Sequence, residues 1–341
     1  MNIVFVHLGT RLPRHLEMNL HSTSKIASAH EVLLIADKQT VRKDLPFKIV
    51  LNKSTNNQEY VKNHLLHDSD FREGFWFSTL LRIVAVAEYV IETNAPVLHI
   101  ESDVIISQNF PFNIFSEISN KIAFPVVSDT HAIASLLYIA NADLARELLT
   151  FILTYLKSET KATDMLVLHE FQIAKPNLVL SLPTGIIDTK SGNAMVTDKI
   201  YAEHDFGLKV FGGVFDGFDI GMYLFGEDPR NHRGVIPLHT LDHESYLNAS
   251  KLTYKYNKQS QSLHIVNNVF QKTTIPIYSL HIHSKAKLMF SLKTQGIYMQ
   301  LCLFFMRIGL NNLFSFRIFI VAVKNKCRKI LEGINLNNEM K

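Results

Sequence analysis

The feature that most constrains the fold is an alternation of short apolar runs with helix-like stripes. Short β-rich runs occupy residues 2–8, 30–37 and 47–52, and each is bounded by turn or charged residues. Runs of this kind are typical of strands buried on both faces of a mainly parallel sheet. A weaker helical spacing over residues 14–28 separates the first two runs. The opening therefore predicts a β-α-β-β order and an α/β fold.

The middle of the chain continues this alternation. Residues 75–93 keep an apolar stripe at three- and four-residue steps, and Asn94-Ala95-Pro96 ends the predicted helix. Residues 185–262 are richer in Gly, Asp, His and Asn, which predicts loops and short elements covering a site. Further strands are expected at residues 96–100, 122–127, 134–140 and 178–182, with helices after the capping residues Asn141 and Thr163.

Composition narrows the class of protein. The 341 residues are 47% hydrophobic and 19% charged, which supplies a core and excludes disordered and low-complexity classes. Cys302 and Cys327 cannot form a disulfide framework, which suits a reducing compartment. The N-terminal segment has no basic start before its apolar run, so we expect a first strand rather than a signal peptide and a cytoplasmic protein. One body over residues 1–294 and a tail over residues 295–341 are expected.

The tail differs from the body in charge and in pattern. Residues 285–341 hold ten Lys or Arg and two acids, whereas the rest of the chain holds 25 against 29. That balance argues against a nucleic-acid surface on the body. The apolar stretch 297–323 is interrupted by polar groups such as Arg307 and Arg317, so it is a poor transmembrane span. It suits amphipathic helices at an anionic membrane surface, and a packed helical pair or a dimer surface is the alternative.

Two carboxylates stand where a predicted buried strand ends. Glu101 and Asp103, at i and i+2, point the same way on an extended backbone. Two hard oxygens at the mouth of a sheet can bind a divalent cation that holds a diphosphate. Strand ends of open α/β sheets are also where ligands usually bind. We therefore expect a metal site here, although an isolated E-x-D tripeptide is more often a solvated turn.

A second candidate cluster lies late in the chain. His281 and His283 alternate with apolar residues and precede Lys285. A histidine nitrogen can complete a carboxylate metal site, and a neighbouring ammonium can neutralise phosphate oxygens. We expect His283 to be the ligand and Lys285 the phosphate contact. His281 points the same way on an ideal strand and could replace His283, although we expect it to be a hydrogen-bonded core histidine.

With these residues in place, the chain resembles the GT-A glycosyltransferases, especially bacterial enzymes that build capsule or lipopolysaccharide sugars. That resemblance implies a Rossmann-like mixed sheet flanked by helices, a nucleotide-sugar donor, Mn²⁺ or Mg²⁺, and glycosyl transfer to a hydroxyl. It spans about residues 1–290 and rests on the β-α-β opening, Phe75-Trp76 through Arg82, Glu101-Ser102-Asp103 in place of D-x-D, His283-Ser284-Lys285, and the segment 215–234. Glu at the first acidic position departs from the family pattern, so Asp103 is the firmer expected ligand.

The resemblance also implies a division of labour within the body. A nucleotide-binding half covers about residues 1–130 and an acceptor-side half about residues 131–294. Base and ribose would face His7, Gly9 and Thr10 at the end of the first strand. Arg82, Ser102 and Lys285 would approach the phosphates, although Arg82 could equally be a salt-bridged helix residue.

Three acids are candidates for contacts with the reacting sugars. An acceptor alcohol needs a base if transfer inverts the anomeric centre, and Asp164, at the start of a predicted helix, lies where the family places such a carboxylate. Helix capping is its simpler explanation, and Glu170 is a weaker alternative. Asp216 and Asp219, in a glycine-rich segment, are expected to contact the donor or acceptor sugar.

These expectations describe a metal-dependent hexosyltransferase in bacterial surface polysaccharide synthesis. It would act on a glycan or lipid-linked glycan and lie at the inner face of the cytoplasmic membrane, bound to anionic lipid through its tail. A sugar nucleotidyltransferase is the enzymatic alternative, which would show a Gly-rich basic loop after the first strand. A non-catalytic, membrane-docked glycan-binding or assembly protein is the other.

Overall fold

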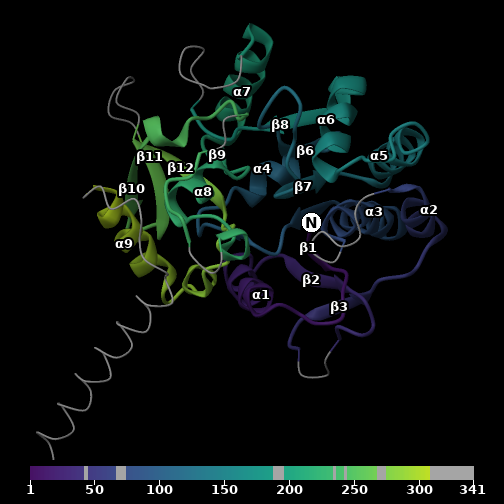
Figure 1. Ribbon diagram of the computed structural model, residues 1–341, viewed down its shortest axis with the longest axis horizontal. Helices are drawn as coiled ribbons and strands as arrows, with labels where there is room; N and C mark the ends of the chain where they lie inside the picture. Colours follow the sequence, from purple (N-terminus) through teal and green to yellow (C-terminus); the bar gives the residue numbers. More distant parts are fainter. Residues whose placement is uncertain are drawn as a thin grey trace, which may run out of the picture.

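The computed structural model describes residues 1–41, 45–66, 74–186, 196–232, 236–241, 244–266 and 274–307. Its described strands form two sheets, each with its own apolar cluster. Figure 1 shows the second sheet, with β10, β11 and β12, on the side of the molecule away from helices α2, α3 and α5.

The first sheet confirms the α/β class. Its seven described strands lie in the order β3-β2-β1-β4-β7-β6-β8. Neighbours are parallel from β3 through β4 and again at β6–β8, whereas β7 runs antiparallel to both of its neighbours. The strands are β1 (Asn2–His7), β2 (Glu31–Ala36), β3 (Lys48–Leu51), β4 (Val97–Ile100), β6 (Ile122–Pro125), β7 (Leu136–Ile139) and β8 (Val179–Leu182).

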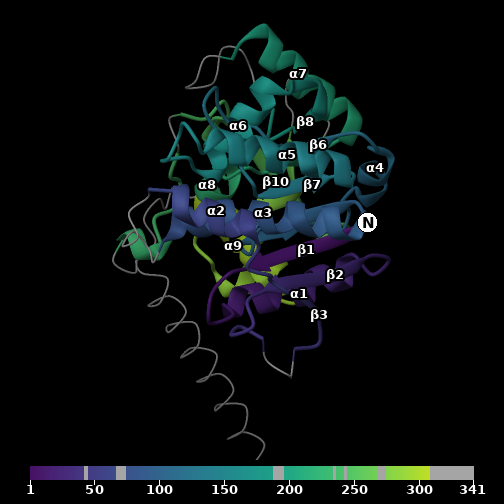
Figure 2. The same ribbon diagram turned by 90° about the vertical axis from the view of Figure 1, so that its right-hand side faces the viewer.

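Helices flank this sheet, as the sequence predicts. Figure 2 shows α3 beside β1 and α1 beside β2. Helix α3 buries most of its length because its apolar residues face both the sheet and α5, and it ends at Asn94 in the left-handed conformation. The helices here are α1 (Arg14–Ile26), α2 (Asn56–His64), α3 (Phe75–Thr93), α4 (Phe112–Glu117), α5 (Ala142–Tyr155) and α6 (Asp164–Ala174), with the 3₁₀ turn η2 (Pro176–Leu178).

Among the described strands, the chain passes between the two sheets three times, from β4 to β5, from β5 to β6 and from β8 to β9. Strand β4 ends at Ile100 in the first sheet, and β5 begins at Val104 in the second. Within the second sheet β10, β11, β12 and β5 are antiparallel neighbours, and β9 pairs in parallel with β12. Its strands are β5 (Val104–Ile106), β9 (Val214–Phe215), β10 (Thr253–Asn257), β11 (Ser262–Val266) and β12 (Thr274–His281).

The stretch predicted to be mainly loops is more regular than expected. Residues 185–262 contain the 14-residue helix α7 (Asp198–Phe211), which begins after the capping side chain of Thr197 and ends at Gly212 in the left-handed conformation. The prediction of loops was therefore wrong for this part. Other elements from here to the end of the described chain are α8 (Asp219–Phe225), η3 (Pro229–His232), η4 (Ala249–Lys251), η5 (Lys287–Phe290) and α9 (Gln295–Arg307).

The predicted tail begins with helix α9. One face of α9 packs against η5, β10 and α8, and buries Tyr298, Met299 and Cys302. Among the described helices, none is long and apolar enough to cross a bilayer. Residues 308–341, with Cys327 and most of the basic groups, lie outside the described residues, as do positions 233–234 of the glycine-rich segment. The division of the body into halves stays a prediction.

Candidate functional site

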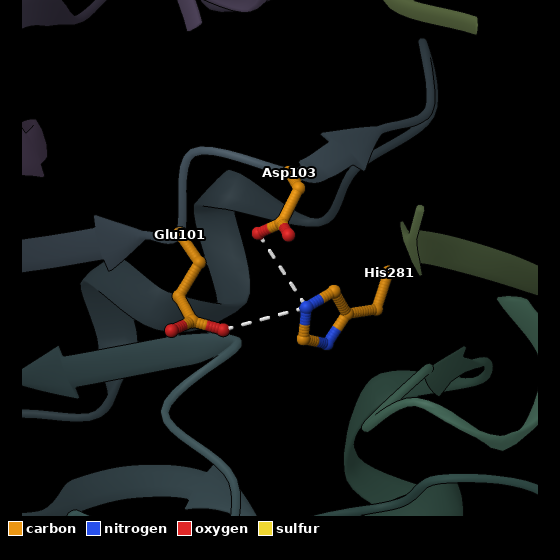
Figure 3. Close-up of side chains that lie close together, drawn as sticks. All are labelled: Glu101, Asp103 and His281. Atoms are coloured by element: carbon orange, nitrogen blue, oxygen red, sulfur yellow. Dashed lines mark ion pairs between the residues drawn. The ribbon is translucent and has the colours of Figure 1, made fainter. Parts of the chain in front are cut away.

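Glu101, Asp103 and His281 meet where the chain crosses between the sheets. Their ligand atoms all lie within 4.8 Å of one another, which is close enough to hold one metal ion. Nε2 of His281 lies 3.6 Å from Oε2 of Glu101 and 3.5 Å from Oδ1 of Asp103. Both carboxylates point at the same ring nitrogen (Figure 3). Two carboxylates and an imidazole form a donor set that can hold a divalent cation.

Strand pairing brings these groups together from distant parts of the sequence. In the antiparallel β5–β12 pair, His281 lies opposite Val104. The main-chain N–H of Ile282 donates to the Asp103 carbonyl at 2.7 Å. On the other side, Nδ2 of Asn19 donates to the carbonyls of Ser102 and Val104. The turn that carries both acids is therefore fixed by β12 and by helix α1.

The ring of His281 is oriented by its second nitrogen. Nδ1 donates to the Gly217 carbonyl at 2.7 Å, which leaves Nε2 facing the carboxylates. Burial alone lowers the pKa of His281, but the charge of Asp103 and its hydrogen bond raise that pKa to about 9. Burial would raise the pKa of Asp103, yet His281 and Lys285 hold it well below its usual range. A positive charge is thus favoured between the two acids, and a divalent cation would replace the proton on Nε2.

Asp216 supports this histidine. Its carboxylate has 0% exposure and accepts the main-chain N–H groups of Ile220, Gly221 and His281 at 2.8 to 3.0 Å. These hydrogen bonds hold the start of α8 and the end of β12 together, and the sugar contact predicted for Asp216 stays a prediction.

His283, the metal ligand preferred in the sequence analysis, packs against His281. The two rings stack with centroids 4.1 Å apart, and the ring of Phe218 packs against His283. Burial and the neighbouring His281 lower the pKa of His283 to about 3, so this ring is neutral. The metal-ligating group found in the described residues contains His281 instead. We accordingly carry His281 into the proposal as the ligand and keep His283 as its packing partner.

Cationic side chains surround the acidic pair. Nη2 of Arg82 lies 2.5 Å from Oε1 of Glu101, and Nζ of Lys285 lies 3.7 Å from carboxylate oxygens of both Asp103 and Asp228. Arg230 forms a forked ion pair with Asp228, so the turn at residues 228–230 belongs to the same charge network. Arg82 therefore forms a salt bridge, as in the alternative interpretation of this residue, and its partner Glu101 is a proposed metal ligand.

A large cleft opens beside β1 and α1. Its volume is about 870 Å³, and Thr10, one of the expected nucleotide contacts, lines it. The Gly9 carbonyl accepts a hydrogen bond from Thr40, and His7 is bonded to the Arg11 carbonyl. The cleft is lined by residues 10–14 with Glu17, Met18, His21, Gln39 and Thr40.

His15 is a candidate site residue that the sequence analysis missed. It lies on α1, within electrostatic reach of Asp103 and Lys285, and its buried Nε2 has no hydrogen-bond partner in the described chain. Burial lowers its pKa to about 4. The available signal was the basic segment from Arg11 to His15 directly after the first strand.

Asp164 lies within electrostatic reach of Arg82 and Glu101. It is buried at the first position of α6, where the Thr163 side chain caps the helix. Burial raises the pKa of Asp164, against the lowering effect of Arg82. Its Oδ1 has no hydrogen-bond partner among the described residues. Glu170 instead lies near Tyr155 at the end of α5.

A cavity of about 150 Å³ is lined in part by Met165, the residue that follows Asp164. Met165, Phe218 and Ser245 help to line it, and Phe218 also contacts His283. Asp219 is buried nearby and accepts a hydrogen bond from the Ser245 hydroxyl at 2.8 Å. The sugar contact expected of Asp219 stays a prediction.

Comparison with known proteins yields remote similarities. No protein-family model and no curated protein matches the sequence. The PaToxG glycosyltransferase is 13% identical, with 62% of this chain and 78% of that chain covered and a TM-score of 0.38. Mouse xyloside xylosyltransferase 1 is 7% identical, with 62% and 93% covered and a TM-score of 0.37. A glycosyltransferase involved in glycosylation of the PBCV-1 major capsid is 12% identical, with 60% and 88% covered and a TM-score of 0.30. With scores this low, a functional conclusion has to come from the site.

Proposed function

We propose that the protein is a metal-dependent glycosyltransferase that moves a sugar from a nucleotide-sugar donor to a hydroxyl of a glycan or lipid-linked glycan. The observation that carries this proposal is the convergence of Glu101, Asp103 and His281 at the crossing between the sheets. A cation held by these three groups supplies neutralisation of the donor diphosphate. The adjacent cleft of about 870 Å³ is large enough for a nucleotide.

The chain's own residues share the remaining work. Lys285 places an ammonium beside Asp103, where it stabilises negative charge on the departing nucleotide. Arg82 orients Glu101 through their ion pair. Thr10, which lines the cleft, contacts the nucleoside together with His7 at the end of β1. Asp164, with a raised pKa and one free oxygen, takes the proton from the attacking hydroxyl. Donor and acceptor then meet over the small cavity at Phe218.

A panel of nucleotide sugars, assayed for Mn²⁺-dependent hydrolysis, tests this function. Wild-type protein should cleave at least one donor, and Asp103→Asn and His281→Ala should each lose at least about 100-fold, because even supporting groups around a metal cost 10- to 100-fold. Asp143→Asn, at an exposed ion pair with Arg146, is the matched control and should retain full activity. The proposal is contradicted if the protein binds no donor in the presence of metal, or if Asp103→Asn is fully active. Release of pyrophosphate from sugar phosphate and nucleoside triphosphate would favour a nucleotidyltransferase instead.

The proposed setting is the inner face of a bacterial membrane, in surface polysaccharide synthesis. Support comes from α9, whose outer face exposes Ile297, Leu301 and Phe304 at 63%, 39% and 55%. These residues are spaced at i, i+4 and i+7, so they form one apolar stripe. The sequence from residue 285 onward is strongly basic, which suits attraction to anionic lipid. Binding of the tail to the membrane would place the candidate site close to a lipid-linked acceptor.

A further inference from the structure

A second cavity, of about 210 Å³, lies between α6 and α7 and has no part in the transfer proposed above. Its polar lining comes from His169 and Gln172 of α6, Glu203 and His204 of α7, and Asp129 and Tyr246 from the connecting segments. The volume is sufficient for several water molecules or one small ligand.

Two histidines in this lining are buried with an unused nitrogen. His169 is 7% exposed and His204 is 3% exposed, and Nδ1 of each has no hydrogen-bond partner in the part of the chain that the structure describes. Nε2 of His204 accepts the main-chain N–H of Thr184 at 2.9 Å. Burial lowers the pKa of His204 to about 4, so the ring is neutral and Nδ1 carries its hydrogen. Buried donors are nearly always bonded, and this N–H has no acceptor among the described residues, so it can bond to a ligand or a water molecule.

The cavity lies next to the smaller one, because both are lined by residues of α6 and by residues 245–246. Met165 lines the smaller cavity beside Asp164, and His169 lines this one a single helical turn further along α6. Ser245 and Tyr246 likewise line the first and the second cavity. The two cavities share the segments 126–127 and 245–246, which are joined where the Tyr246 N–H donates to the Val127 carbonyl at 2.7 Å. The four residues from Met165 to His169 advance about 6 Å along the axis of α6, which is close to the length of one sugar unit.

The lining favours an uncharged ligand rich in hydroxyl groups. Asp129 and Glu203 contribute two carboxylates, and the one ammonium in the lining, Lys199, already lies 3.8 Å from Glu203. An anionic ligand would meet this excess negative charge. Amide, imidazole and carboxylate groups together with apolar Ile173 match a sugar ring, which has both polar edges and apolar faces.

We propose that this cavity binds the second sugar unit of the acceptor, an uncharged sugar linked to the one that is glycosylated beside Asp164. The inference rests on the proposed transferase function and names its acceptor as a glycan of at least two units. Gln172 and Glu203, which lie 3.3 Å apart on neighbouring helices, would form the accessible part of this subsite.

Sugar binding to the full chain without metal or nucleotide tests this subsite. The probes are lactose, maltose and cellobiose, each compared with galactose or glucose, and titrated while the protein is observed by NMR. At least one disaccharide should bind about tenfold more tightly than its monosaccharides. Gln172→Leu/Glu203→Leu should remove that advantage, because both side chains are partly exposed and their loss leaves the helices intact. Glu147→Leu, which removes a comparable surface pair with Lys175, should retain it.

The outcomes separate this inference from the transferase itself. If no disaccharide binds, or if the double variant keeps the full advantage, the cavity holds only water and the inference is overturned. Asp103→Asn should abolish metal-dependent donor cleavage while leaving disaccharide binding unchanged. Sugar binding that follows Gln172 and Glu203 in a protein that cleaves no donor would overturn the transferase and leave a glycan-binding site.

Discussion

Gly221 leaves no room for a side chain where α8 passes the end of β12. A Cβ atom at this position would lie 1.8 Å from the His281 carbonyl oxygen, which is a main-chain atom and cannot rotate away. Gly221→Ala should therefore displace His281 and lower the affinity for Mn²⁺ by at least about tenfold. Calorimetric titration with Mn²⁺ measures this. Gly296→Ala, which would press only on the tip of Tyr256, is the control, and equal affinities in both variants would contradict the proposed role of His281.

Asp164 can be separated from its capping position by a substitution that keeps its shape. Asp164→Asn should lower sugar transfer by about 100-fold or more, because removal of a general base typically costs that much. Binding of the nucleotide sugar should be almost unchanged, since the metal-binding group is intact. Glu170→Gln, further along the same helix, should transfer sugar normally. Single-turnover transfer and donor binding measure the two effects, and an active Asp164→Asn would exclude it as the base.

The choice between two histidines shows where sequence reasoning stopped. The acids at positions 101 and 103 and the late His-x-His pair could be singled out from strand ends and alternation. Alternation gives His281 and His283 the same direction, so it cannot choose between them. The choice depends on the Gly217 carbonyl, which binds Nδ1 of His281, and on β12 ending at that residue. Both are tertiary features.

At the scale of elements, the outer stripe of α9 makes a measurable prediction. Ile297→Ser/Phe304→Ser should weaken binding to vesicles that contain anionic phosphatidylglycerol by at least about tenfold, because each apolar side chain contributes about 1.5–3 kcal/mol when buried. Vesicle sedimentation measures the effect. Leu66→Ser, at another exposed apolar residue, is the control. Unchanged vesicle binding in the double variant would remove α9 from the membrane surface.

The first sheet was easier to predict than the second for a physical reason. Strands such as β1 and β4 are buried on both faces and appear as uninterrupted apolar runs. Strands β10 and β11 are partly exposed and carry polar residues, so their pattern is weak. Helix α7 did carry a signal, since Thr197-Asp198 begins it and Gly212 ends it. These signals were overlooked because residues 185–262 are rich in Gly, Asp, His and Asn, which favoured a prediction of loops.

At the scale of the whole molecule, His204 makes stability depend on pH. Its pKa is about 4 in the folded protein and 6.5 in an unfolded chain, so the unfolded state binds more protons between these values. The free energy of unfolding should fall as pH drops from 6.5 to 4, by about 2 kcal/mol at pH 5 from this residue. Urea unfolding at pH 7 and pH 5 measures the loss. His204→Gln should flatten this dependence, whereas the half-exposed His64→Gln should not; an equal slope in His204→Gln would contradict the assignment.

The crossing from β4 to β5 has a mechanical consequence. Asp103 and His281 lie about 180 positions apart in the chain and belong to a seam between two separate apolar cores. An ion held by both would act as a reversible cross-link that joins the cores only in the native state. With Mn²⁺ at about 100 times its dissociation constant, unfolding should cost about 2.7 kcal/mol more, and a chelator should remove that gain in thermal denaturation. The concentration of the ion would then determine how long the protein stays folded as well as the rate of the proposed transfer.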